Sequence, residues 1–218
     1  MAFRAAIFDL DGTLLDTIED LTDSMNAALA ALGHPLRTTA ECRNLVGDGL
    51  ATFIRRALPE SFRGDETAAA RLDKLMRMEY QARQAVKTRP YPGIADMLSR
   101  LAERGVPHCV LSNKPHASTL SVVARYFPGH PFRIVYGARD GFPVKPDPAG
   151  ALEIAGLLDL PPAAILYLGD TNTDMMTARA AGMFAVGALW GFRTREELLA
   201  NGAQALAARP ADVLRLLG

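Results

Sequence analysis

The most informative residues of this chain are Phe8-Asp9-Leu10-Asp11-Gly12-Thr13, which follow the apolar segment Ala5-Ala6-Ile7. The apolar residues predict a buried strand, and Asp9 and Asp11 stand where it ends. Residues two apart in an extended segment point the same way, so both carboxylates face one small volume; Gly12 permits a turn beside them. Like charges this close need a cation or a proton to compensate them. The stretch therefore predicts a functional site, with an Asx-type turn as the alternative for this stretch alone.

A second acidic pair follows another apolar run. Asp170 comes shortly after Ala164-Ile165-Leu166, and Asp174 lies four residues further on, where a helix is predicted to begin. The helix dipole favours an acid in the first turn, so capping accounts for one of the two. Both together, beside Asp9 and Asp11, predict a site for a hard cation. Magnesium takes oxygen ligands and keeps several waters, so few carboxylates suffice.

Two further segments carry polar groups after apolar runs. In Pro143-Val144-Lys145-Pro146 the prolines stiffen the backbone and restrict where the ammonium group lies; a surface loop is the alternative. In Val110-Leu111-Ser112-Asn113 a hydroxyl and an amide follow a predicted strand. These groups are able to donate to a phosphate, and equally Ser112 is able to cap the helix that begins after Pro115.

Apolar runs and helical patterns alternate along most of the chain. Such alternation predicts an α/β fold, a doubly wound parallel sheet with a Rossmann-like core. Ligands bind beyond the carboxyl ends of the strands in these folds, and Asp9, Ser112 and Asp170 all stand there. Residues 200–208 are predicted as helix and loop. The predicted strands are 3–8, 106–111, 132–137, 164–168 and 183–188, and the helices between the later ones are 94–104, 117–126, 149–158 and 173–181.

The strand signal stops between residues 17 and 88, where helical periodicity covers 18–32, 39–45, 50–58 and 65–86. This pattern predicts an α/β core formed by residues 1–16 and 89–218. Residues 17–88 are then a small α-helical subdomain inserted after the first strand. The two chain crossings, near Asp16 and at 87–90, are predicted to act as its hinge.

Composition excludes several classes of protein. Lys and Arg number 24 and Asp and Glu number 24, so no net charge attracts nucleic acid or a membrane surface. The two cysteines, Cys42 and Cys109, are too few for a disulfide framework, and no stretch approaches the length of a membrane span. We expect a cytoplasmic protein, a monomer or homodimer, that acts on a small molecule.

Four motifs occur in a fixed order along the chain: Asp9-x-Asp11-x-Thr13, Ser112, Lys145 and Gly169-Asp170-x-x-x-Asp174. In this combination the chain resembles, over essentially its whole length, the haloacid dehalogenase-like phosphohydrolases. Within that superfamily it is most similar to the phosphoglycolate phosphatase branch. The narrower resemblance rests on residues 45–50, 112–114, 143–146, 190–192 and 195–198.

The resemblance implies a mechanism. Asp9 is the expected nucleophile, which forms an aspartyl-phosphate, and Asp11 is the acid that protonates the leaving group and then the base for the attacking water. Lys145 is expected to stabilise the transition state. The implied phosphate-binding residues are Gly12, Thr13, Ser112, Asn113 and Lys145. The implied cofactor is Mg2+, held by Asp9, the backbone carbonyl of Asp11, Asp170 and, through water, Asp174.

The inserted subdomain corresponds in this resemblance to a cap, which closes over the site and chooses the leaving group. The Gly47-Asp48-Gly49 turn stands at a predicted helix start, where N–H groups are available to an anion. Arg55 is a candidate ligand for a substrate carboxylate. A plain turn and a solvated helix face explain these residues equally.

The expected function is magnesium-dependent hydrolysis of a small organic phosphate monoester, with 2-phosphoglycolate as the leading substrate. Three alternatives remain. A pyrophosphatase or nucleotidase shares the phosphate-handling motifs. A sugar-phosphate mutase usually carries a histidine soon after the first motif, where this chain has Leu21. A non-catalytic binding protein of the same fold has no need of Asp11.

Overall fold

The computed structural model describes residues 3–83 and 85–217. The chain divides into two compact units, one formed by Met1–Leu15 with Pro90–Gly218 and the other by Asp16–Arg89. The division predicted from the sequence differs by one residue at each crossing. Residues 1, 2 and 218 of the predicted core, and residue 84 of the predicted insertion, lie outside the described residues.

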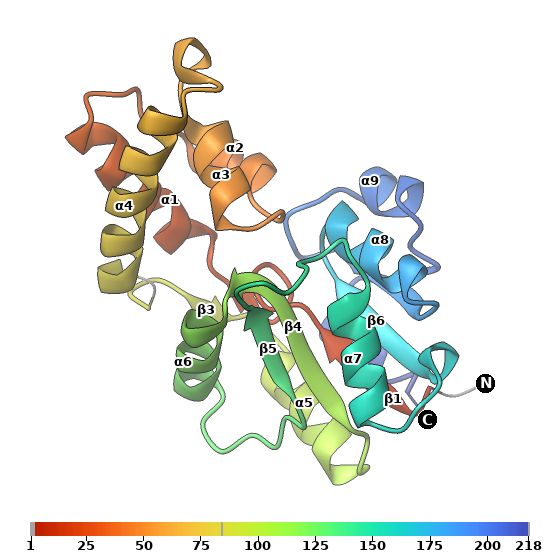
Figure 1. The fold of residues 1–218 in the computed structure, drawn as a ribbon. Coiled ribbons are helices and arrows are strands. Elements are labelled where there is room, and N and C mark those ends of the chain that lie inside the picture. The colour runs from red at the N-terminus through yellow and green to blue at the C-terminus, as the bar shows by residue number, and fades with distance from the viewer. Residues whose placement is uncertain (1–2, 84, 218) are drawn as a thin grey trace. The chain divides into compact units, whose positions relative to one another are not determined.

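The first unit is built on a six-stranded sheet with the order β5-β4-β1-β6-β7-β8 (Figure 1). Each neighbouring pair of strands runs parallel, which confirms the predicted α/β fold with a doubly wound sheet. The strands are β1 (Ala5–Phe8), β4 (His108–Pro115), β5 (Val135–Ala138), β6 (Ile165–Gly169), β7 (Phe184–Ala188) and β8 (Ala205–Ala207).

The register of the three central strands places the end of β1 beside the end of β6. Phe8, the last residue of β1, pairs with Val110 of β4 and with Leu168 of β6. Asp9 therefore lies one residue beyond the level of Leu168, where β6 ends at Gly169, while β4 continues past this level to Pro115. Because all three strands run the same way, their carboxyl ends meet at one edge of the sheet.

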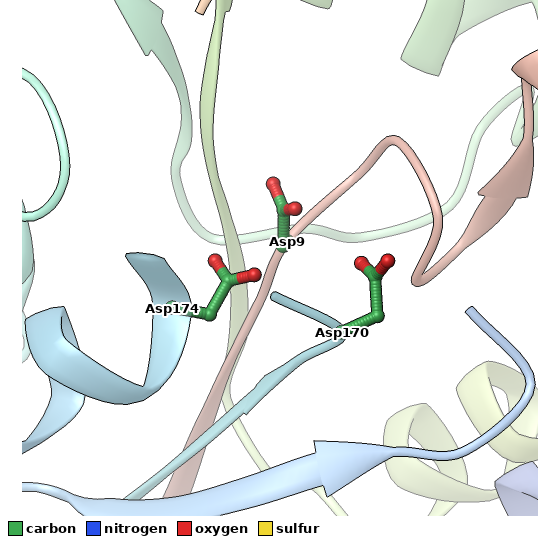
Figure 2. Close-up of side chains that lie close together, drawn as sticks. All are labelled: Asp9, Asp170 and Asp174. Carbon is green, nitrogen blue, oxygen red and sulfur yellow. The ribbon is translucent and has the colours of Figure 1, made fainter. Parts of the chain in front are cut away.

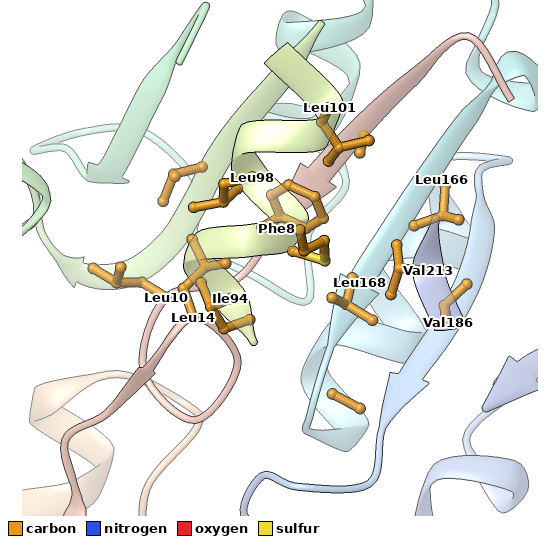
Figure 3. Packing of buried hydrophobic residues seen from close by; sticks show 14 of the residues in the cluster. Phe8, Leu10, Leu14, Ile94, Leu98, Leu101, Leu166, Leu168, Val186 and Val213 are labelled. Carbon is orange, nitrogen blue, oxygen red and sulfur yellow. The ribbon is translucent and has the colours of Figure 1, made fainter. Parts of the chain in front are cut away.

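Helices cover both faces of this sheet. They are α5 (Ile94–Glu103), α6 (His116–Tyr126), α7 (Ala149–Leu157), α8 (Asn172–Ala180), α9 (Arg195–Ala200) and α10 (Pro210–Val213). Alternate residues of β1 enter two different cores, as the two-residue period of a strand requires. Phe8 packs with α5, α6 and α10 (Figure 3), whereas Ile7 packs with α7, α8 and α9. Helices on both faces keep a parallel sheet buried.

The second unit consists mainly of helices: α1 (Ile18–Ala31), α2 (Thr39–Leu45), α3 (Leu50–Ala57), the 3-10 turn η1 (Glu60–Phe62) and α4 (Glu66–Arg83). The helix predicted over 65–86 ends earlier, since residues 85 and 86 form a turn. Among the helices of the described residues, none is both long and apolar enough to cross a membrane.

The two crossings carry structure that the sequence pattern did not predict. Short strands β2 (Leu15–Asp16) and β3 (Arg89–Pro90) pair with each other. The buried carboxylate of Asp20, on α1, accepts hydrogen bonds from the backbone N–H groups of Val86, Lys87 and Thr88 and from the Thr88 hydroxyl, at 2.7–3.2 Å. The returning crossing is therefore tied to the first helix of the insertion.

One prediction for the end of the chain is wrong. Residues 200–208 were expected as helix and loop, but Ala205–Ala207 form the edge strand β8 beside β7. The segment is too short to show a strand period. Leu206 packs against Gly187 of β7, where an added Cβ would lie 2.8 Å from the leucine side chain. Pairing with an existing sheet, rather than local propensity, decides this element.

Candidate active site

Three of the four predicted acids converge at the carboxyl edge of the sheet. Asp9 follows β1, Asp170 follows β6, and Asp174 lies in the first turn of α8 (Figure 2). Each offers a carboxylate oxygen, and these three oxygens lie within 4.8 Å of one another. All three residues are buried, with Asp170 and Asp174 fully so. Buried charges of one sign need a compensating cation.

Asp170 is held in place by two hydrogen bonds and two glycines. The Thr13 hydroxyl donates to its Oδ1 at 2.7 Å, and the Phe192 backbone N–H donates to its Oδ2 at 2.8 Å. A Cβ at either Gly12 or Gly191 would lie 2.2 Å from an Asp170 atom. The carboxylate therefore occupies space that only glycine leaves open. Gly12 and Thr13, the predicted phosphate ligands, thus both contact Asp170, and the Gly12 N–H donates to the Leu15 carbonyl at 2.8 Å. Their role toward phosphate stays a prediction.

Asp174 has two separate tasks. Its Oδ2 accepts from the Thr171 hydroxyl at 2.7 Å and from the Thr171 N–H at 3.0 Å, which completes a capping box at the start of α8. Its Oδ1 accepts from Lys145 Nζ at 2.7 Å and from the Tyr167 hydroxyl at 3.4 Å. Capping, the alternative weighed for this acid, occupies one oxygen and leaves the other for the lysine.

Lys145 lies between the acids. Its Nζ is 2.8 Å from Asp9 Oδ1 and 2.7 Å from Asp174 Oδ1, and its side chain is only 3% exposed. The Asn113 amide fixes the lysine backbone: it donates to the Lys145 carbonyl and accepts from the Lys145 N–H, both at 2.9 Å. Asn113 is thus a support for Lys145, and the loop that carries this lysine is part of the site.

Burial and charge make this group of residues strongly electrostatic. Burial, and then the charge of Asp174, raise the pKa of Asp9 to about 7, although Lys145 opposes the shift. Burial, and then Asp9, raise the pKa of Asp170 well above its ordinary value. Burial alone would lower the pKa of Lys145, but Asp174 and Asp9 outweigh it and raise that pKa. Three acids against one ammonium leave negative charge, and their all-oxygen donors fit a hard divalent cation such as Mg2+.

The fourth acid, Asp11, does not join this cluster with its carboxylate. Both of its oxygens lie 2.9 Å from Nζ of Lys114, whose side chain is 4% exposed. The contribution expected from the Asp11 backbone carbonyl stays a prediction. Lys114, which lies within residues 112–114 of the narrower resemblance, was not predicted as a site residue. The sequence feature that could have identified Lys114 is a charged residue next to small polar residues after an apolar run.

Ser112 and Lys114 share one irregular piece of strand. Leu111 pairs with Tyr136 and Pro115 with Ala138, so three residues of β4 stand opposite the single residue Gly137 of β5. A bulge of this kind re-aims side chains and is common beside active sites. The Ser112 Oγ accepts from the Lys114 N–H at 3.2 Å, which leaves its own hydrogen for another acceptor.

The candidate substrate residues of the insertion lie in the second unit. Gly47 and Gly49 adopt positive φ angles of 122° and 87° in the turn before α3. Asp48 pairs with Arg56 at 2.7 Å, and Arg55 pairs with Glu66 of α4 at 2.8 Å. Arg55 thus has an acidic partner on an exposed helix face, and the substrate roles of these residues stay predictions.

Three comparisons agree about the relatives of this chain. The model of the family described as haloacid dehalogenase-like hydrolase matches residues 6–188. Phosphoglycolate phosphatase 1 of Pseudomonas aeruginosa is 33% identical over 193 residues, which cover 87% of this chain and 70% of that protein. Phosphoglycolate phosphatase of Pectobacterium atrosepticum is 30% identical over 220 residues, 100% of this chain and 93% of that protein. A crystal structure from Lactobacillus delbrueckii subsp. bulgaricus superposes with a TM-score of 0.94 at 31% identity and covers 100% of both chains.

Proposed function

This chain belongs to the haloacid dehalogenase-like hydrolase family and is a phosphatase, and we propose that it hydrolyses a small organic phosphate monoester through an aspartyl-phosphate on Asp9, with Mg2+. The observation that carries the proposal is the buried trio Asp9, Asp170 and Asp174 with Lys145 between two of its members. An arrangement made only for stability would not bury three acids around a single ammonium group, since that desolvation is costly.

The donor set favours one arrangement of the cation. Carboxylate oxygens of Asp9 and Asp170 would hold it, with the Asp11 backbone carbonyl as in the family's pattern. Asp174 would act through water, as in the family's pattern, while its two oxygens accept hydrogen bonds from Lys145 and Thr171. When bound, the cation neutralises charge between the attacking carboxylate and the phosphate dianion.

Asp9 is the proposed nucleophile. It stands at the carboxyl end of the central strand, where its backbone N–H donates to the Leu168 carbonyl at 2.9 Å and fixes the residue against β6. A carboxylate oxygen attacks phosphorus, the bond from phosphorus to the leaving oxygen breaks, and Asp11 gives that oxygen a proton. Covalent catalysis splits one difficult hydrolysis into two easier displacements.

Lys145 and Ser112 would hold the phosphoryl oxygens during both displacements. The ammonium group is 2.8 Å from the Asp9 carboxylate, so it is beside the phosphorus that this carboxylate attacks. Asp174 and Asn113 hold the lysine in advance of the reaction. Prepositioned donors of this kind stabilise charge in the transition state without reorganisation. Water then attacks the aspartyl-phosphate, and Asp11 takes up its proton.

2-Phosphoglycolate is the substrate that we propose, because the named relatives are phosphoglycolate phosphatases. The second unit would act as the cap that selects the leaving group, through Gly47, Asp48, Gly49 and Arg55. A small metabolite, rather than nucleic acid, fits the balanced charge of 24 basic and 24 acidic residues. Two buried free cysteines fit the reducing cytoplasm.

The test replaces the nucleophile. We expect D9N to lose at least about 1000-fold in kcat on any phosphate ester, since covalent attack requires the carboxylate, while its circular dichroism spectrum stays native. The measurement is phosphate release with Mg2+ and with EDTA, across 2-phosphoglycolate, sugar phosphates, nucleotides and pyrophosphate. Turnover by D9N equal to wild type would remove Asp9 as nucleophile. Absence of metal-dependent turnover by wild type across the panel would favour a binding protein.

A further inference from the structure

Lys114 is a buried cation that the proposed mechanism leaves without a task. Its Nζ lies 2.9 Å from each oxygen of Asp11, and its side chain is 4% exposed, against 21% for the side chain of Asp11. One end of the pair is thus enclosed in protein and the other reaches solvent. Asp11 is the residue assigned to proton transfer, so its neighbour bears directly on the reaction.

The backbone around Lys114 is built to bring it there. The β4 bulge places Ser112, Asn113 and Lys114 opposite Gly137 alone. The Thr119 hydroxyl donates to the Lys114 carbonyl at 3.1 Å. A Cβ at Gly137 would lie 2.5 Å from that same carbonyl and 2.4 Å from the Thr119 hydroxyl oxygen. The lysine position therefore depends on contacts from β5 and α6 as well as on its own strand.

Stability does not explain such a pair. Burying an ammonium group costs desolvation, and the attraction to its partner repays this only in part, so replacing buried ion pairs by apolar residues is often neutral or stabilising. Neighbouring polar side chains also hold residues of the site: Asn113 fixes Lys145, and Thr13 fixes Asp170. Both of these polar side chains position a residue of the proposed chemistry.

We propose that Lys114 is the positioning residue of Asp11: it fixes the direction of the Asp11 carboxylate and stabilises the carboxylate that remains after the leaving oxygen has been protonated. This inference rests on the proposed function. When the bond between phosphorus and the leaving oxygen breaks, the proton of Asp11 passes to that oxygen and leaves a carboxylate 2.9 Å from the ammonium group. The structure contains the same pairing of carboxylate and ammonium group. The same carboxylate then accepts a proton from the water that attacks the aspartyl-phosphate.

The experiment compares K114M with wild type on two esters that differ in their need for a proton. The alkoxide of 2-phosphoglycolate, or of the best alkyl ester in the panel, leaves only when protonated. The phenolate of 2,4-dinitrophenyl phosphate leaves without a proton. We expect K114M to lower kcat/KM by about 100-fold for the alkyl ester, within the range of general acid catalysis, and by less than about 3-fold for the aryl ester. The ratio kcat/KM is used because it reports the steps up to release of the first product.

Three further variants separate positioning from a structural role. K114R keeps the charge and should recover at least about tenfold of the alkyl-ester loss, since an arginine also pairs with a carboxylate. D11N combined with K114M should be no slower on the alkyl ester than D11N alone, because both remove one function. K74M, at an exposed lysine of α4, is the matched control and should match wild type on both esters. Equal losses on both esters in K114M, or additive losses in the double variant, would overturn the inference.

A measurement without turnover completes the test. In EDTA, the Tm loss of the double variant D11N/K114M should be smaller than the sum of the two single losses, since each single change leaves one buried partner unpaired. Additive Tm losses would contradict the pairing. If wild type hydrolyses no phosphate ester, the proposed function fails while this coupling still reports on the pair. If wild type is active but K114M loses both esters alike, only the role of Lys114 fails.

Discussion

Glycine 12 shows how a single missing side chain shapes the acidic cluster. Its φ of +91° is unfavourable for other residues, and a Cβ there would lie 2.2 Å from Asp170 Oδ2. The sequence predicted Gly12 as a turn residue beside Asp9 and Asp11. It could not reveal that the space belongs to Asp170, because that carboxylate is more than 150 residues away and arrives only through the register of β1 with β6.

We expect G12A to lose metal-dependent turnover by at least about 100-fold, because the new methyl group displaces an acid of the cluster. G105A is the matched control. Gly105 has a φ of +66° and no atom within 4 Å of an added Cβ. Alanine at this position therefore introduces the backbone strain, about 1–2 kcal/mol, without contacting the site. Isothermal titration with Mg2+ and phosphate release measure the two effects. If G12A and G105A lost similar turnover, backbone strain alone would explain the loss in G12A.

The sequence marked the acids and the lysine that meet at the sheet edge, but it did not mark Lys114, the partner of Asp11. Asp9, Asp170 and Lys145 stand in short motifs after apolar runs, so local sequence marks them. Lys114 contacts Asp11, a residue 103 positions away in the sequence. A contact of this length depends on strand order, and strand order is a property of the folded sheet.

At the scale of elements, the amino end of β4 carries a contact between two histidines. His108 Nδ1 lies 2.8 Å from the Val106 carbonyl and therefore carries a hydrogen, which leaves His108 Nε2 to accept from His130 Nε2 at 2.6 Å. The rings pack beside Phe132. Burial lowers the pKa of His108; burial and then the charge of His108 lower the pKa of His130. The pair joins β4 to the segment that leads into β5.

This pair predicts acid lability of that region. Both histidines have folded pKa values below those of the unfolded chain, so the native state binds fewer protons, and the stability they contribute is lost as the pH falls below about 6.5. H130Q keeps a hydrogen-bonding side chain but does not titrate, so its acid unfolding midpoint should lie at lower pH than that of wild type. Fluorescence-monitored acid titration measures it, with H34Q as control for the loss of one imidazole elsewhere. A midpoint unchanged in H130Q would contradict the role of the pair.

Strands with a long apolar pattern could be predicted from the sequence. Strands that form only because they pair with a neighbouring strand could not. The strands β1, β4, β5, β6 and β7 follow apolar runs and occur where they were expected. The edge strand β8 and the pair β2 and β3 have two or three residues each, too few for a period to appear. The crossing at 87–90 was predicted as a hinge. The hydrogen bonds from residues 86–88 to Asp20 could not be predicted, since 66–68 residues separate the partners.

At the scale of the whole molecule, three buried acids repel one another in the metal-free protein and lower the stability of the folded state. Asp9 has a pKa of about 7 in the folded state, against about 3.9 in an unfolded chain. Between these values the native state binds more protons than the unfolded state, so this group lowers stability as the pH rises through the window. Asp170 shifts in the same direction. A bound divalent cation removes the repulsion and favours the deprotonated acids.

D9N isolates this effect, because its amide does not titrate while the histidine pair and all other groups remain. In EDTA, the Tm of D9N minus the Tm of wild type should become more positive as the pH rises from 5 to 8. Mg2+ should then raise the Tm of wild type more at pH 8 than at pH 5. A ligand that binds only the native state stabilises it by about 2.7 kcal/mol when its concentration is 100 times its Kd. D9N, with one ligand fewer, should respond less at both. Differential scanning fluorimetry over this pH series measures all four quantities. A Tm difference that stays constant with pH, or a Mg2+ response larger at pH 5, would show that the acidic cluster neither stores this repulsion nor binds the cation.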